Sequence, residues 1–272
     1  MKRRFALVCV ALLCSACLRA TTTITVRQDG SGLIDQEVGA NPEAMAMLKG
    51  FAGAAAEQQK SGAGAAASAQ PSIFGEPEAK KLADQMGVKF LSGEPIKTAE
   101  LEGYRAHYSF DDVTKVKVKM NQDATGGLAE SGKTAAEPPF GFQFEKHGTS
   151  SLLTINMPEQ KPGSVGPLNQ LGMGRGATQN SAQNEQAVAM MKMMLKGLYV
   201  DVTLAVDGKV IKTNAPYVNG SKVTLVQMDF DKLLASEGAL QKLQQANDPR
   251  ALKDIPGLKV VAEPKVTIEF GR

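Results

Sequence analysis

The stretch that decides the fold is residues 22–38, TTITVRQDGSGLIDQEV. It contains two runs in which apolar and polar residues alternate, with Asp29-Gly30 standing between them. An Asp-Gly pair favours the positive backbone angles of a tight turn, and alternation favours a strand with one buried face. The stretch therefore predicts a β-hairpin with strands over 22–28 and 32–38.

Two further turn pairs predict strands in the second half of the chain. Asp207-Gly208 separates residues 199–206 from 209–214, and Asn219-Gly220 precedes 222–228. We interpret each pair as a hairpin turn, which makes antiparallel pairing dominant. Other short runs with a strand-like pattern are predicted as strands over 88–96, 104–110, 113–120, 140–146, 151–157 and 266–270.

Helices are fewer and short. Asn41-Pro42-Glu43 provides an N-cap, a first-turn proline and an acidic residue, which predicts a helix that begins at this point. Further helices are predicted over 76–86, 184–196 and 230–245. The sequence thus predicts an α+β fold, made mainly of antiparallel sheet built from hairpins with a few short helices.

Segments rich in small and polar residues divide the chain. Residues 52–69 are rich in Ala and Gly and are predicted to form a flexible segment. Residues 161–183 are rich in Gly, Pro, Ser and Gln and are predicted to form a linker loop. We therefore expect two α+β lobes, over 17–160 and 184–272.

The N-terminal segment has the features of a bacterial export signal. Lys2, Arg3 and Arg4 precede an apolar run over residues 5–16 that ends in small residues. A run of this length is too short to span a bilayer, which needs about 20 residues. Residues 1–16 are therefore predicted to be a signal peptide that directs the chain to the extracytoplasmic side of the membrane.

The residues that follow predict a lipid anchor. The stretch 13–17, LCSAC, resembles the lipobox of bacterial lipoproteins, in which the sulfur of the final cysteine receives diacylglycerol before cleavage. Cys17 is therefore expected to carry a diacylglyceryl group and an N-acyl chain, which together hold a protein stably on a membrane. We expect an envelope protein, on the outer membrane in a cell that has two membranes. Because Cys14 stands where Leu is usual, ordinary signal cleavage at the same bond is the alternative.

Composition argues against several classes of protein. All three cysteines lie within the first 17 residues, so the remaining chain has no thiol for a disulfide, a metal site or catalysis. Removal of residues 1–16 leaves 28 basic and 28 acidic residues, so attraction to nucleic acid has no source. Only His107 and His147 supply imidazole. We expect no enzyme activity, no catalytic residues, no metal and no cofactor.

Two groups of apolar side chains are candidates for a ligand-binding cavity. They are the period-two stripe Phe140, Phe142 and Phe144 and the helical cluster Met190, Met193 and Met194. Ordinary core packing explains both patterns. The alternative is an adaptable apolar cavity for a lipid, because methionine is flexible and polarizable.

A short basic patch is a candidate contact for lipid headgroups. Lys115, Lys117 and Lys119 alternate with apolar residues and project from one face of the predicted strand 113–120. A solvated strand face explains them, and contact with anionic headgroups is the alternative.

The order of these features resembles that of LppM-type bacterial lipoproteins. The resemblance is carried by the lipobox-like Cys17, the hairpin over 22–32, the stretch GYRAHYSFDD at 103–112 and VTLAVDGKV at 202–210. It implies an α+β envelope module, anchored through the cysteine and associated with lipid or glycolipid binding. We therefore expect a non-catalytic, lipid-anchored protein that binds an amphiphile. The alternative is a structural or adaptor lipoprotein that binds another envelope protein.

Overall fold

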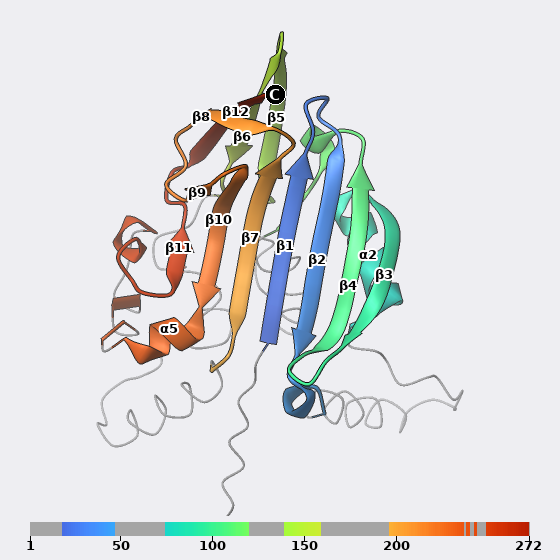
Figure 1. The fold of residues 1–272 in the computed structure, drawn as a ribbon, viewed down its shortest axis with the longest axis vertical. Coiled ribbons are helices and arrows are strands. Elements are labelled where there is room, and N and C mark those ends of the chain that lie inside the picture. Colours follow the sequence, from blue (N-terminus) through green and yellow to red (C-terminus); the bar gives the residue numbers. More distant parts are fainter. Residues whose placement is uncertain are drawn as a thin grey trace, which may run out of the picture.

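The computed structural model describes residues 18–46, 74–119, 139–158, 196–236 and 249–271, together with 238, 239, 242 and 243. Its strands form two sheets, which we call the large sheet and the small sheet (Figure 1). The short helices lie against these sheets or at their ends. The fold is therefore mostly β and of the α+β class, as the sequence predicts.

The large sheet has eight strands, and the path through seven of them begins at β11 and ends at β3. In sheet order these are β11 (Leu258–Val260), β10 (Lys222–Asp229), β7 (Tyr199–Val206), β1 (Leu18–Val26), β2 (Gly32–Ala40), β4 (Glu102–Phe110) and β3 (Lys89–Lys97). The eighth, β9 (Val218–Asn219), pairs with β10. Among the described strands, only β1 and β7 pair in parallel.

The small sheet has four antiparallel strands. In sheet order they are β5 (Gly141–His147), β6 (Ser150–Asn156), β12 (Lys265–Gly271) and β8 (Lys209–Thr213). Each sheet takes strands from both sides of residues 161–183, since β1 pairs with β7 and β6 pairs with β12. The sheets therefore cut across the predicted lobes 17–160 and 184–272, because pairing joins segments distant in the chain. Residues 52–69 and 161–183 lie outside the described residues.

The core lies between the inner faces of the two sheets. Along β1 and β7, alternate side chains such as Ile24 and Leu204 are fully buried in one apolar cluster. The small sheet contributes Leu153, Ile268 and Phe270 to the same cluster. This is the alternation expected for strands with one face on a core.

The described helices begin where their sequence signals predict. Residues 42–46 are helical, and the side-chain oxygen of Asn41 accepts a hydrogen bond of 2.6 Å from the N–H of Ala44. The other α-helices are α2 (Glu76–Met86) and α5 (Phe230–Ala235), and the 3₁₀ turns are η1 (Val113–Lys115) and η2 (Pro249–Leu252). The predicted helix over 184–196 falls outside the described residues except for its last residue.

Two of the three predicted hairpins are confirmed and one is wrong. Asp29-Gly30 joins the antiparallel pair β1 and β2, and Asn219-Gly220 joins β9 to β10. Asp207-Gly208 instead leads from β7 in the large sheet to β8 in the small sheet, and these two strands do not pair. The N–H of Asp207 donates to the carbonyl of Val26. This bond holds the end of β7 against the end of β1, where the chain leaves the large sheet.

The strand predicted over 113–120 is also wrong in its first part. Asp112 caps η1, because its carboxylate accepts bonds from the N–H and the hydroxyl of Thr114 at 3.0 and 2.6 Å. Residues 116–119 then run extended without joining a sheet, although Val116 and Val118 are buried as alternation predicts. Local capping by an Asp-x-Thr sequence therefore overrides the strand pattern.

The N-cap of α5 gives a prediction for stability. The Asp229 carboxylate accepts a bond of 3.1 Å from the N–H of Lys232 and lies 2.9 Å from its Nζ. Asp229→Ala is expected to lower the free energy of unfolding by about 1 kcal/mol at neutral pH, because a helix N–H loses its acceptor. Urea denaturation followed by circular dichroism measures this change.

The stabilisation that the Asp229 carboxylate contributes depends on pH, and the direction of the change can be predicted. Burial alone would raise the pKa of Asp229, but the bonds from Lys232 outweigh it and lower the pKa below its usual value. A lowered carboxyl pKa means stabilisation that is complete at neutral pH and is lost as the pH falls below about 4. The difference between the wild type and Asp229→Ala should therefore shrink in acid, and a constant difference from pH 7 to pH 3 would contradict it.

Candidate functional site

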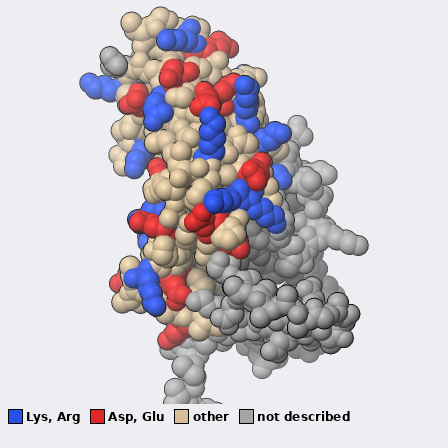
Figure 2. All heavy atoms as spheres, turned by 90° about the vertical axis from the view of Figure 1, so that its right-hand side faces the viewer, with Lys and Arg blue, Asp and Glu red and all other residues tan. Residues whose placement is uncertain are grey.

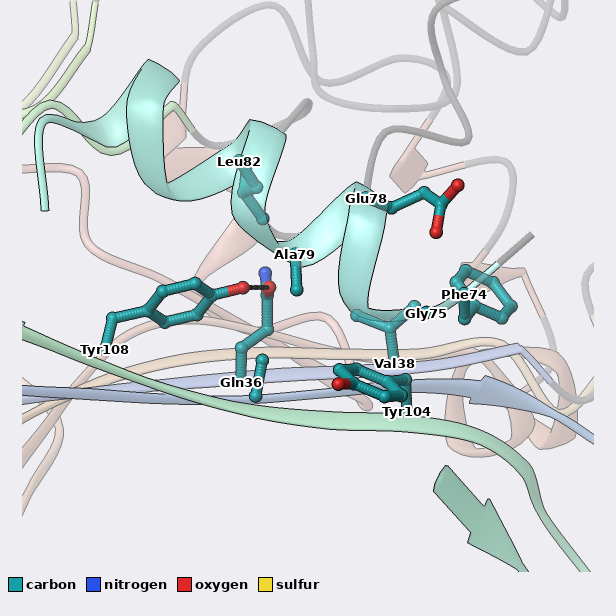
Figure 3. A pocket seen from close by; sticks show the side chains of 10 residues that line it. Gln36, Val38, Phe74, Gly75, Glu78, Ala79, Leu82, Tyr104 and Tyr108 are labelled. Atoms are coloured by element: carbon teal, nitrogen blue, oxygen red, sulfur yellow. Dashed lines mark hydrogen bonds between the residues drawn. The ribbon is translucent and has the colours of Figure 1, made fainter. Parts of the chain in front are cut away.

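The candidate site is a pocket between helix α2 and strands β2 and β4 of the large sheet (Figure 3). The helix starts after Gly75, with Pro77 and two acidic residues in its first turn. It ends at Gly87, whose positive φ of 71° lets the N–H of Val88 return to the carbonyl of Ala83 at 3.0 Å. These signals fix where the helix begins and ends over the sheet.

The helix packs on the sheet through small and medium side chains. Its buried residues are Ala79, Leu82, Ala83 and Met86. Near the start of the helix, this packing leaves a small open-sided pocket with a cavity volume of about 30 Å³. The strands supply Gln36, Val38, Tyr104, Ala106 and Tyr108. The helix and the residues before it supply Phe74, Gly75, Glu78, Ala79 and Leu82.

One end of the pocket carries buried neutral polar groups. The Tyr108 hydroxyl donates to Oε1 of Gln36 at 3.3 Å, and these residues are 0% and 5% exposed (Figure 3). Thr22 is the cross-strand partner of Gln36 on β1 and is 2% exposed. Its hydroxyl has no hydrogen-bond partner among the described residues. An unpaired buried hydroxyl costs free energy, but Thr22 is not among the residues that line the pocket.

A tyrosine and a glycine form the wall toward the sheet edge. A Cβ atom built on Gly93 of β3 would lie 2.4 Å from the hydroxyl oxygen of Tyr104, so the tyrosine ring occupies the space above this glycine. Burial, reinforced by the nearby Glu76 carboxylate, raises the pKa of the Tyr104 hydroxyl. Tyr104 is therefore a neutral polar group at neutral pH, held by the absence of a side chain at Gly93.

The predicted phenylalanine stripe lies in the core and not along this pocket. Phe140 and Phe142 are 1% and 5% exposed and belong to the apolar cluster between the sheets. Phe144 is half-buried and packs over the backbone of Gly30. The core interpretation of this stripe therefore matches its position. Met190, Met193, Met194 and Cys17 lie outside the described residues.

The three predicted headgroup lysines do not share one strand face. Lys115 lies in η1 and pairs with Asp112 at 3.5 Å. Lys117 is exposed and Lys119 is half-buried in the extended segment that follows. On the side of the molecule shown in Figure 2, the described basic and acidic side chains alternate and do not gather by sign. Headgroup contact by these lysines stays a prediction.

The outer face of the large sheet carries a row of ionic pairs. Arg105 bridges Glu37 and Glu94 at 2.9 and 2.8 Å. Next to it, Nδ1 of His107 lies 2.6 Å from the Asp35 carboxylate. Ser92 is the cross-strand partner of His107, but no hydrogen bond joins these two described side chains. The group is a half-exposed network, and such surface pairs contribute little stability.

Sequence reasoning did not identify the pocket, because its residues come from three separate segments. A signal was nevertheless present. Thr22 and Gln36 occupy inward positions of two alternating strands, where apolar residues are expected. Polar residues at inward positions of paired strands indicate either a buried network or a site, and here one of the two, Gln36, lines the pocket.

The structural comparison gives a distant similarity to a known protein. No helix in the described part of the chain is long and apolar enough to cross a membrane. No family model and no curated protein matches the chain. The structure is similar to the NMR structure of the folded domain of LppM from Mycobacterium tuberculosis, with a TM-score of 0.36 and 11% sequence identity over 94% of this chain and 91% of that chain.

Proposed function

We propose that the chain is a lipid-anchored envelope protein that binds the apolar part of an amphiphile in the pocket beneath α2, without catalysis. The observation that carries this proposal is the composition of the pocket. Its walls include the apolar side chains of Val38, Phe74 and Leu82. Its polar groups are the side chains of Gln36 and Tyr108, which are joined by a hydrogen bond. A mainly apolar concavity with a few converging polar groups is typical of a small-molecule site.

The size of the pocket limits the ligand. The cavity itself has a volume of about 30 Å³, room for about one water molecule, and it opens to solvent on one side. An apolar segment of a ligand can therefore enter only if α2 or the side chains beneath it move outward. The expected anchor at Cys17 supports this function, because a protein held on a membrane meets its lipids at high local concentration.

Gly93 allows a direct test of the pocket. Gly93→Ala places a methyl group where the Tyr104 ring now lies, so the ring must leave its position and change the pocket wall. Binding of Nile red, a neutral apolar dye, is expected to weaken by about tenfold or more, which corresponds to about 1.4 kcal/mol. Dye fluorescence titrated with the purified chain measures this, and the chain contains no tryptophan that would complicate the signal.

Gly141→Ala is the matched control. Gly141 also lies on a strand at the edge of its sheet, and a Cβ there would meet the Asn156 side chain at an ordinary distance of 3.4 Å. This variant should bind the dye as the wild type does. Equal binding by both glycine variants and the wild type would contradict a site beneath α2.

An adaptor function is the second candidate. Strand β8 lies at an edge of the small sheet, and its Ile211 is 58% exposed. An open strand edge can pair with an extended segment of another protein. Crosslinking on whole cells that recovers one protein partner, and loses it in Ile211→Lys, would favour this function over ligand binding.

A further inference from the structure

The expected lipid anchor lies directly beside the folded body. Cys17 is the residue expected to carry the acyl chains, and β1 begins at the next residue, Leu18. Leu18 pairs with Ala40 of β2 and packs against a small apolar cluster that includes it. Arg19 pairs with Tyr199 of β7, and its guanidinium carbon lies 5.4 Å from the centre of the tyrosine ring. No residue is therefore left to act as a linker between the anchor and the sheet.

We call the end of the large sheet at which β1 begins the anchor end. The strand registers place Leu18 opposite Ala40 of β2, and Ala40 opposite Glu102 of β4. The turn over residues 98–101 between β3 and β4, the helical residues 42–46 and α5 also lie at this end (Figure 1). The anchor end is therefore a surface made by several elements and not by the first strand alone.

The opposite end of the large sheet is far from the anchor. β1 has nine residues, which span about 30 Å at the usual rise of a strand. The turn at Asp29-Gly30 follows, and the small sheet lies beside it, since the Ser151 hydroxyl donates to the carbonyl of Gln28 at 3.0 Å. Lys115 of η1 is near this turn as well, because the N–H of Val113 donates to the carbonyl of Gly30. The predicted headgroup contact at Lys115 and the anchor end therefore lie at opposite ends of the sheet.

The exposed side chains of the anchor end suit a layer of lipid headgroups. Arg19 and Lys97 are basic, Glu43 and Glu100 are acidic, and all four are exposed. Met45, in contrast, is 3% exposed and packs in the small apolar cluster. In the described part of the chain, the exposed large hydrophobic side chains lie away from this end and are Leu91, Ile211 and Val218. Because charged groups are costly to bury in hydrocarbon, this end can lie on headgroups but does not insert.

We propose that the direct junction of Cys17 with β1 holds the anchor end against the headgroups of the membrane, with the small sheet pointing away from it. Consecutive Cα atoms are about 3.8 Å apart, so Leu18 stays at the membrane surface as long as the acyl chains stay in the bilayer. Leu18 and Arg19 are paired within the sheet, so they cannot unroll into a spacer without breaking β1. This inference rests on the proposed function, because it needs the lipid anchor.

Labels at the two ends of the lipidated chain test this orientation. The full chain is produced in a bacterium that processes lipoproteins and is reconstituted into phosphatidylcholine vesicles. Glu100→Cys and Thr149→Cys each place one exposed thiol, at the anchor end and in the turn between β5 and β6 at the opposite end. The processed chain holds no other free thiol, because its native cysteines all lie within residues 1–17. A fluorophore on each thiol is then exposed to lipids with a nitroxide on the headgroup, which quenches only at short range.

We expect the label in Glu100→Cys to lose most of its fluorescence and the label in Thr149→Cys to keep it. Equal quenching of the two labels, or stronger quenching in Thr149→Cys, would overturn the orientation. Intact mass tests the anchor separately. A processed chain whose mass shows no acyl groups would overturn the lipid anchor of the proposed function, whereas an acylated chain with equal quenching overturns the orientation alone.

A spacer variant tests whether the direct junction is the cause. Insertion of about 20 Gly and Ser residues between Cys17 and Leu18 gives a flexible spacer with a root-mean-square length of about 25 Å. In this background the label in Glu100→Cys is expected to recover most of its fluorescence while the chain stays on the vesicles. Quenching that is unchanged by the spacer would overturn the inference, because the end would then bind lipid without being held there by the junction.

Discussion

Phe142→Ala is expected to lower the free energy of unfolding by about 3–5 kcal/mol, because it removes a ring from a closely packed core. Phe142 is 5% exposed and lies opposite Ile155 of β6, which is fully buried. The surrounding strands belong to two sheets and cannot close over the space that the ring leaves. For a domain stable by about 5–15 kcal/mol, such a loss is a large fraction of the total.

The phenylalanine stripe also supplies its own control. Phe144 lies two residues further along β5 on the same face but is only half-buried, so Phe144→Ala should cost clearly less. Urea denaturation followed by far-ultraviolet circular dichroism measures both variants. If Phe142→Ala kept its stability but lost Nile red binding, the stripe would line a ligand cavity and the core interpretation would be wrong.

Strand positions follow from the sequence because alternation is a local property. The predicted strand over 104–110 corresponds to β4, and the hairpin at Asp29-Gly30 brings Ile24 opposite Ile34 as its alternation requires. Alternation along a strand determines on which face of the sheet each side chain lies, and a turn pair sets the register between adjacent strands. No distant part of the chain is needed for either result.

The choice of non-adjacent partners does not follow from the sequence. β1 and β7 pair in parallel, although more than 170 residues separate them. The alternation pattern of either strand does not predict which strand it pairs with. One indirect signal exists, since Thr203 and Ala205 of β7 are buried on the outer face, as expected for a central strand. The pocket depends on another long-range choice, because the pairing of β2 with β4 places Gln36 beside Ala106.

Replacing Gly208 tests the corner where the predicted hairpin is absent. Gly208 has φ of 140°, and a Cβ there would lie 2.4 Å from the carbonyl oxygen of Gly271 at the end of β12. Gly208→Ala therefore meets both backbone strain and a clash with main chain that cannot rotate away. We expect the free energy of unfolding to fall by about 2–4 kcal/mol.

Gly220→Ala separates the clash from the strain. Gly220 also has a positive φ, of 60°, but a Cβ there meets nothing within 4 Å, because it lies in the true hairpin between β9 and β10. Only the backbone cost remains, so this variant should lose about 1 kcal/mol. Both variants are compared by urea denaturation under the same conditions. If both variants lose the same free energy of unfolding, the corner from β7 to β8 does not pack on Gly271. A larger loss for Gly208→Ala would show that the two sheets are in close backbone contact at this glycine.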